Sequence, residues 1–162
     1  MISTSKVRNE MIIDDVITCV ARKQTPVILT RFKEHAKFLH DALKEKADHV
    51  FLLYGDNSDK ENAEIRVKLK QIPENESLIL VATGQKIGEG FDFPRLDVLM
   101  LAAPVSFEGR LEQYVGRLNR DYVGKEAVYV YDYIDSHVRY FDKMYAKRLR
   151  TYRKTGFSIW TQ

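Results

Sequence analysis

Residues 113–120, in the second half of the chain, carry two fixed positive charges and an amide at helical spacing. At about 100° of rotation per residue, Gln113, Arg117 and Arg120 share one face of a helix, while apolar side chains point to the other. A guanidinium stays charged at any working pH, and its planar fork of donors fits phosphate oxygens. The segment therefore suits contact with phosphate. An ordinary amphipathic helix with a solvated face has the same spacing.

A second segment, residues 82–94, follows an apolar run and holds three glycines within seven residues. Its backbone can therefore approach a ligand closely. Thr83 can cap a short helix whose amides attract phosphate, and Gly84 and Gln85 are candidates for contact with a nucleic-acid backbone. Asp92 suits ribose hydroxyls, since a carboxylate accepts hydrogen bonds and repels phosphate. A glycine-rich connection between two strands is the structural alternative.

Two well-known phosphate-binding patterns fail to match this sequence. Gly88 and Gly90 begin a dinucleotide-like pattern, but its third glycine would fall at Phe93. Gly124 and Lys125 lack the first glycine and the hydroxyl residue that a P-loop needs around them. No Asp-Glu pair follows a strand to hold magnesium. The chain thus has residues that can contact phosphate without those that usually cradle a nucleotide and its metal ion.

The elements that must position these residues alternate along the chain between apolar, strand-like runs and helical patterns. We expect strands at residues 26–30, 49–53, 77–82, 97–101 and 127–133. We expect helices at residues 5–22, 33–46, 60–71, 84–88, 108–119 and 138–154. This order predicts a parallel α/β sheet within a single domain spanning residues 1–162, whose ligands bind beyond the carboxyl ends of the strands.

Size and composition exclude several classes of site. A chain of 162 residues with 44% hydrophobic content suits one compact domain. The lone Cys19 excludes an intrachain disulfide and a multi-cysteine zinc site, and no long apolar run or signal peptide is present, so we expect a cytoplasmic protein. His35 and His40 are five residues apart and lie on different faces of a helix, so no metal site is expected.

Basic charge is concentrated near the end of the chain. Residues 139–154 carry seven basic side chains and one acidic side chain, giving +6 within a chain of net charge +3. This charge is compatible with a polyanionic partner. Phe141, Tyr145, Leu149 and Tyr152 recur at helical spacing, which favours packing over base stacking.

Taken together, these segments resemble the second RecA-like lobe of superfamily two helicases of the DEAD/DEAH group. Residues 27–39 resemble motif IV, residues 83–94 motif V and residues 113–120 motif VI. Residues 130–133 and 147–152 resemble the branch related to restriction and DNA-repair helicases. The resemblance covers nearly the whole chain and implies a three-layer RecA-like fold of the P-loop NTPase type with a mostly parallel central sheet.

The resemblance also implies a role for each candidate residue. In that family ATP with Mg²⁺ lies between two lobes, and the first lobe supplies the P-loop lysine, the magnesium ligands and the acid that activates water. The catalytic residues of this lobe would be Gln113, Arg117 and Arg120. The nucleotide-binding residues would be Gly90, Asp92 and Gly116. The nucleic-acid-binding residues would be Thr30, Arg31, Thr83, Gly84 and Gln85.

The implied partners are the N-terminal RecA-like lobe of the same full-length protein and a nucleic acid, with DNA favoured over RNA and no membrane contact. We expect the chain alone not to hydrolyse ATP, because it lacks the motifs of the first lobe. The alternative is a free-standing nucleic-acid-binding or regulatory module that kept the fold without ATPase activity. The joint presence of Arg117, Arg120 and Asp92 favours the motor lobe.

Overall fold

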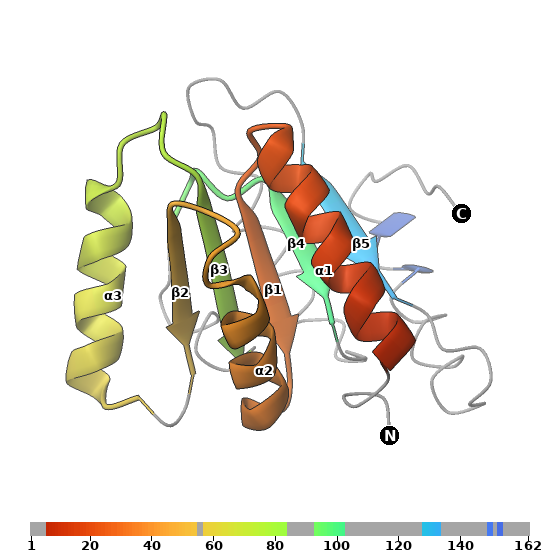
Figure 1. Ribbon diagram of the computed structural model, residues 1–162, viewed down its shortest axis with the longest axis horizontal. Helices are drawn as coiled ribbons and strands as arrows, with labels where there is room; N and C mark the ends of the chain where they lie inside the picture. The colour runs from red at the N-terminus through yellow and green to blue at the C-terminus, as the bar shows by residue number, and fades with distance from the viewer. Residues whose placement is uncertain are drawn as a thin grey trace.

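The described strands form one five-stranded sheet in the order β2-β3-β1-β4-β5, and every pairing among them is parallel (Figure 1). The computed structural model describes residues 6–54, 57–83, 93–102, 128–133, 149–150 and 152–153. The strands are β1 (Pro26–Thr30), β2 (His49–Leu53), β3 (Leu78–Thr83), β4 (Val98–Leu101) and β5 (Tyr129–Asp132). The predicted parallel α/β sheet is confirmed.

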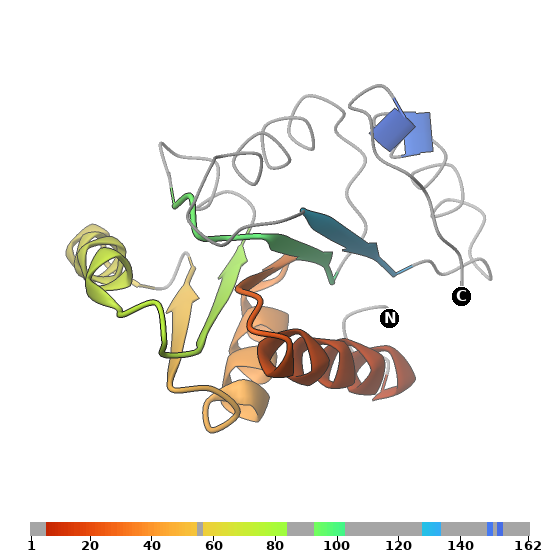
Figure 2. The same cartoon turned by 90° about the horizontal axis from the view of Figure 1, so that it is seen from above.

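Helices cover both faces of this sheet, as Figure 2 shows from above. The helices are α1 (Lys6–Ala21), α2 (Lys33–Leu43) and α3 (Asp59–Gln71). α1 and α2 pack together on one face, and Leu69 of α3 packs on the other. The three layers that the resemblance implied are therefore present. None of the helices in the described ranges is long and apolar enough to cross a membrane.

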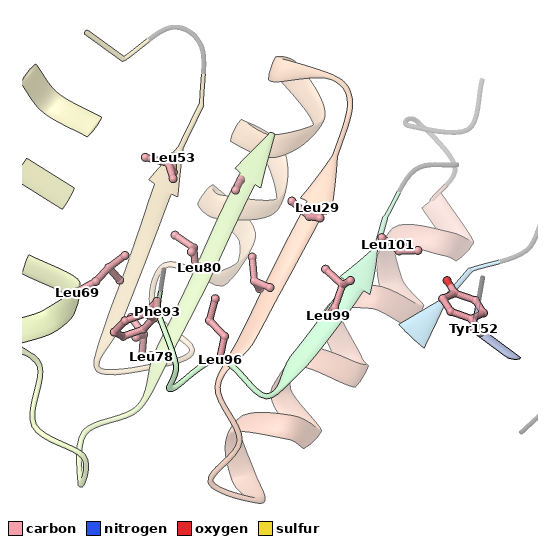
Figure 3. Packing of buried hydrophobic residues seen from close by; sticks show 12 residues of the cluster. Leu29, Leu53, Leu69, Leu78, Leu80, Phe93, Leu96, Leu99, Leu101 and Tyr152 are labelled. Atoms are coloured by element: carbon pink, nitrogen blue, oxygen red, sulfur yellow. The ribbon is translucent and has the colours of Figure 1, made fainter. Parts of the chain in front are cut away.

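Alternation along each strand divides the core into two clusters. In β1, Val27 and Leu29 join the cluster that contains Leu69 of α3, whereas Ile28 joins the cluster under α1 and α2. Figure 3 shows Leu29, Leu80 and Leu99, which come from three neighbouring strands, in the first cluster. β1, β3 and β4 are buried along their whole length, as expected for parallel strands covered on both faces.

In six of the elements the observed boundaries differ from the predicted ones by one to three residues, and two of these differences have a clear local cause. α2 ends at Leu43 instead of residue 46, because the apolar period stops there and the Lys46 N–H closes a tight turn onto the Leu43 carbonyl at 2.8 Å. α3 begins at Asp59, one residue earlier than expected. Ser58 and Glu61 form a capping box that fixes this start, each side chain accepting from the other's backbone N–H at 3.1 Å.

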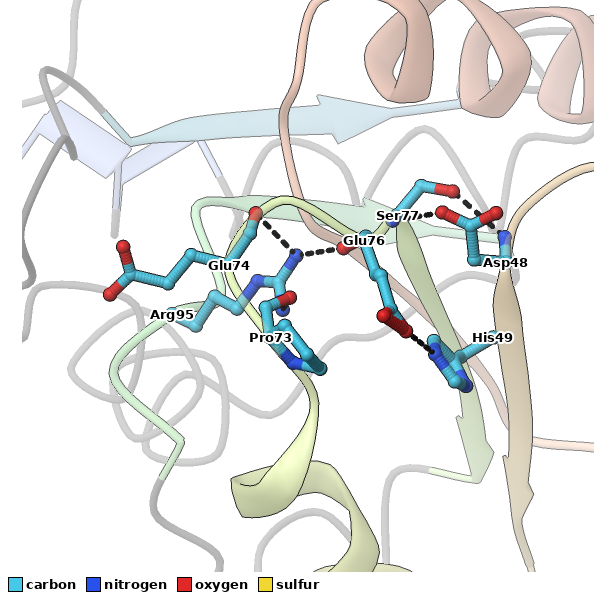
Figure 4. A network of polar contacts seen from close by, with 7 residues as sticks. All are labelled: Asp48, His49, Pro73, Glu74, Glu76, Ser77 and Arg95. Carbon is cyan, nitrogen blue, oxygen red and sulfur yellow. Dashed lines mark hydrogen bonds and ion pairs between the residues drawn. The ribbon is translucent and has the colours of Figure 1, made fainter.

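Arg95 clamps the connection between α3 and β3 near the amino ends of the strands (Figure 4). Its guanidinium donates to the carbonyl oxygens of Pro73, Glu74 and Glu76. Its Nε donates to the Thr25 hydroxyl at 3.2 Å, which ties the connection to the start of β1. The planar fork of an arginine suits several carbonyl acceptors at once, so this residue has a structural role.

Polar pairs beside this clamp fix the start of β2 against that of β3. Asp48 and Ser77 exchange hydrogen bonds: each backbone N–H donates to the other's side-chain oxygen at 2.8 Å. The backbone and hydroxyl hydrogen bonds from Ser77 lower the pKa of Asp48. His49 donates from Nε2 to the Glu76 carboxylate at 2.7 Å. These contacts all lie at the amino edge of the sheet.

β5 is anchored from both faces by tyrosine hydroxyls. Tyr133, directly after β5, donates to the Asp15 carboxylate of α1 at 2.6 Å, and burial together with this hydrogen bond raises the pKa of Tyr133. Tyr152 donates to the Asp132 carboxylate at 2.7 Å. Tyr152 is buried, and Leu149 packs against the same core cluster. Packing of this part of the predicted stripe is confirmed, whereas Phe141 and Tyr145 lie outside the described residues.

Candidate functional site

The carboxyl ends of three central strands lie side by side. Thr30 of β1 and Thr83 of β3 are register partners at the ends of their strands. The Ala102 N–H, directly after β4, donates to the Leu29 carbonyl of β1 at 2.8 Å. Between β1 and β4 the strand order reverses, because the chain continues from β1 to β2 on one side and from β4 to β5 on the other. Ligands of open α/β sheets bind at such a point.

The segments predicted to carry chemistry follow these strand ends directly in the sequence. Gly84 follows Thr83 at the end of β3, and residues 103–127 connect β4 to β5. Several predicted site residues lie outside the described residues: Gly84, Gln85, Gly90, Asp92, Gln113, Gly116, Arg117 and Arg120. Thr30, Arg31 and Thr83 are described. Their positions define the candidate site.

Thr30 and Thr83 are buried, whereas Arg31 is exposed. Thr30 has only 1% of its surface exposed, and its hydroxyl accepts the Phe32 N–H at 3.4 Å, which closes a turn at the end of β1. Arg31 lies within this turn with its side chain on the surface. Of the three, Arg31 is thus the side chain placed to reach a phosphate. Phe32, which the sequence analysis passed over, is 45% exposed beside it.

His35 is the residue whose place in the site the sequence analysis missed. Its ring lies within 2.9 Å of both the Thr30 hydroxyl and the Asn9 side-chain oxygen, so it links β1, α2 and α1. Burial, with a smaller contribution from the positive charge of Arg8, lowers the pKa of His35 to about 4. His35 is therefore neutral at physiological pH. His35 lies only five residues after Thr30, so their contact could have been anticipated from the sequence. Its contact with Asn9 spans 26 residues, and no local sequence pattern indicates it.

In the described part of this edge, the Arg31 guanidinium and the Phe32 ring are exposed, and the hydroxyls of Thr30 and Thr83 lie buried beside them. A guanidinium and an exposed ring can contact the phosphates and the bases of a nucleic acid. Within the described ranges, no group of three or more His, Cys, Asp or Glu side chains is placed to hold a metal ion. The arrangement suits an anionic partner at the carboxyl edge.

Comparison with known proteins finds similar sequences over most of this chain. Residues 8–121 match the family described as the helicase conserved C-terminal domain. Transcript termination protein A18 of Yaba-like disease virus is 32% identical over 120 residues, which are 73% of this chain and 24% of the viral protein. The chain thus spans about a quarter of the length of this relative.

Solved structures share the fold. The crystal structure of T4 UvsW aligns with a TM-score of 0.74 and 23% identity, covering 96% of this chain and 34% of UvsW. The C-terminal domain of the DEAD-box protein Dbp5 aligns with a TM-score of 0.68 and 14% identity, covering 94% of this chain and 80% of that domain. The sheet, its two helical layers and the match over residues 8–121 lead to one assignment. The chain belongs to the helicase conserved C-terminal domain family.

Proposed function

We propose that residues 1–162 form the second motor lobe of an ATP-dependent nucleic-acid helicase or translocase. Arg117 and Arg120 act as arginine fingers on the γ-phosphate of ATP, and Gln113 orients the same edge of the phosphate. A guanidinium that meets the charge developing on a transferred phosphoryl group accelerates the reaction by about 10³ to 10⁵. The N-terminal RecA-like lobe of the full-length protein supplies the P-loop and the magnesium ligands.

Residues of the glycine-rich segment complete this half of the nucleotide site. Gly90 and Asp92 lie near the ribose, where the carboxylate accepts hydroxyl hydrogen bonds, and Gly116 lets the backbone approach the nucleotide. The same segment begins directly after the buried Thr83 with Gly84 and Gln85, which contact the nucleic-acid backbone. ATP binding and release are thereby coupled to movement along the strand through closure and opening of the two lobes.

The observation that carries this proposal is the alignment of the ends of β1, β3 and β4 at one edge of the sheet. Thr30 and Thr83 are register partners there, so the loops that follow them begin next to each other. Residues 84–92 and 103–127, which hold the proposed nucleotide contacts, both continue from this edge. Arg31 is exposed in the turn after β1, and its positive charge is available there for contact with the phosphates of a nucleic acid.

Single-turnover ATP hydrolysis by the whole protein tests the nucleotide half. Arg117→Ala and Arg120→Ala are each expected to lower the rate by about 10³-fold or more while the unfolding midpoint stays within error. Arg22→Ala is the matched control, because Arg22 is exposed and follows α1 at the opposite edge of the sheet. Near-normal turnover by Arg117→Ala and Arg120→Ala would refute the proposal that these residues act as arginine fingers. Arg117-dependent turnover by residues 1–162 alone would refute the need for a first lobe.

Binding of a labelled single strand at several salt concentrations tests the nucleic-acid half. Loss of one phosphate contact in Arg31→Ala is expected to reduce the slope of log Kd against log salt by about one unit, with Arg22→Ala again as the control. Competition between DNA and RNA of the same sequence is expected to favour DNA. An unchanged slope in Arg31→Ala would remove this residue from the interface.

A further inference from the structure

A continuous chain of buried polar groups lies beneath the turn that connects β1 to α2. The Thr30 hydroxyl lies 2.9 Å from Nδ1 of His35, and Nε2 of His35 lies 2.9 Å from Oδ1 of Asn9. Thr30, His35 and Asn9 are 1%, 3% and 6% exposed. A buried hydrogen bond between side chains of separate elements restrains both, because breaking it leaves polar groups without water.

The direction of each hydrogen bond follows from the atoms that meet. Oδ1 of Asn9 can only accept, so Nε2 of His35 carries the proton and donates it. In the neutral ring Nδ1 is then an acceptor, and the Thr30 hydroxyl must donate to it. The Thr30 oxygen keeps its lone pairs for the Phe32 N–H, which approaches to 3.4 Å. In these three hydrogen bonds each donor therefore meets an acceptor.

This tautomer holds while the ring is neutral. Burial and the positive charge of Arg8 on α1 both disfavour a second proton, and they lower the pKa of His35 to about 4. A protonated Nδ1 would offer a donor to Thr30 in place of an acceptor and would force its hydroxyl to rotate. The neutral imidazole therefore fixes the Thr30 hydroxyl in one orientation.

Arg31 lies between Thr30 and Phe32, and these hydrogen bonds restrain both of them. On one side Thr30 is held by His35, and on the other the Phe32 N–H is held by Thr30. The Ala36 N–H donates to the Phe32 carbonyl at 3.0 Å and begins the helical hydrogen bonding of α2. Arg31 and Phe32 nevertheless have exposed side chains. The buried groups therefore set where the exposed cation and ring are presented.

We propose that His35 is a positioning residue for nucleic-acid binding, which holds the turn of Thr30, Arg31 and Phe32 in its binding conformation through the Thr30 hydroxyl. This inference rests on the proposed function, since it assumes that Arg31 contacts the strand. His35 touches no ligand in this role. It reduces the entropy that the turn would otherwise lose when a strand binds.

Two near-isosteric variants separate this role from a general contribution to folding. His35→Asn places an amide oxygen near the position of Nδ1, so it keeps an acceptor for Thr30 and loses the bond to Asn9. His35→Gln places an amide nitrogen near the position of Nε2, so it keeps a donor for Asn9 and loses the bond to Thr30. Each variant breaks one buried hydrogen bond, so similar losses of stability are expected.

The assay measures the Kd of the whole protein for a labelled single-stranded DNA, together with urea unfolding of each variant at the same pH. His35→Gln is expected to weaken binding about 3- to 10-fold, the effect of one typical hydrogen bond, whereas His35→Asn stays close to the parent protein. Thr30→Val is expected to weaken binding less when it is added to His35→Gln than when it is made alone, because the bond between Thr30 and His35 is already lost and only the acceptor for the Phe32 N–H is removed in addition.

Two results would overturn the proposal, and they differ in what else they refute. If Arg31→Ala weakens binding but the two His35 variants bind equally well, His35 has no positioning role, and the nucleic-acid function stands. If Arg31→Ala leaves binding unchanged, the turn is not part of the interface, and the proposed contact fails together with the inference.

Discussion

His35 makes the stability of this domain depend on pH between the pKa of the unfolded and that of the folded residue. The pKa of His35 falls from an ordinary value of 6.5 to about 4 in the folded protein, mainly because the ring is buried. Between these two values the unfolded chain binds a proton that the folded chain does not. The stabilisation by neutral His35 is therefore fully present above pH 6.5 and is lost as the pH falls toward 4.

The size of the effect follows from these pKa values. One pKa unit corresponds to about 1.4 kcal/mol, so a shift from 6.5 to about 4 limits the total effect to about 3 kcal/mol. At about pH 5 the unfolded His35 is almost fully protonated and the folded one is mostly neutral. Acidification from about pH 7 to about pH 5 should therefore lower the free energy of unfolding by about 2 kcal/mol through this residue.

Urea unfolding at both pH values measures this change. His35→Asn cannot titrate, so its loss of stability on acidification should be smaller than that of the parent protein by about 2 kcal/mol. The control is His40→Gln, because His40 is only partly buried on the same helix and hydrogen-bonds its neighbour Asp41. An equal loss of stability in the parent and in His35→Asn would refute the assignment of a buried, neutral imidazole.

Three further substitutions test the contacts that hold the fold around the site. Arg95→Met removes the guanidinium donors to the connection before β3 and should lower the free energy of unfolding by about 2 kcal/mol in urea titrations. Tyr133→Phe removes the hydrogen bond to Asp15 and should lower the free energy of unfolding by about 1 to 2 kcal/mol. An unchanged free energy of unfolding would show that this hydrogen bond does not stabilise β5. Ser58→Ala removes the α3 cap and should cost about 1 kcal/mol, whereas restoration by Ser58→Asp would confirm capping.

Most of the fold could be predicted from local pattern. Strands of a parallel sheet need apolar runs, and residues 26–30 and 49–53 were predicted with the bounds that the buried β1 and the partly buried edge strand β2 have. Helix ends were less predictable. The early end of α2 depends on a turn that returns the chain to β2, and the early start of α3 depends on the Ser58 capping box.

The candidate site divides in the same way. The types and positions of Arg31, Thr83 and the later arginines were enough to predict candidate contacts for an anion at the carboxyl ends of the strands, because parallel strands all end at the same edge of a sheet. Burial of the Thr30 hydroxyl was not predictable. It depends on His35 and on Asn9, which lies 26 residues before His35 in the sequence.

By itself, the sequence determined the alternation of strands and helices, the parallel sheet and the set of side chains able to meet phosphate. These properties follow from periodicity and residue chemistry, which are local. The tertiary structure alone decided the strand order, the pairing of Thr30 with Thr83 and the buried hydrogen bonds from Asn9 through His35 to Thr30. Those depend on how α1 and α2 pack against one face of the sheet, and packing brings together residues whose separation along the chain carries no local signal.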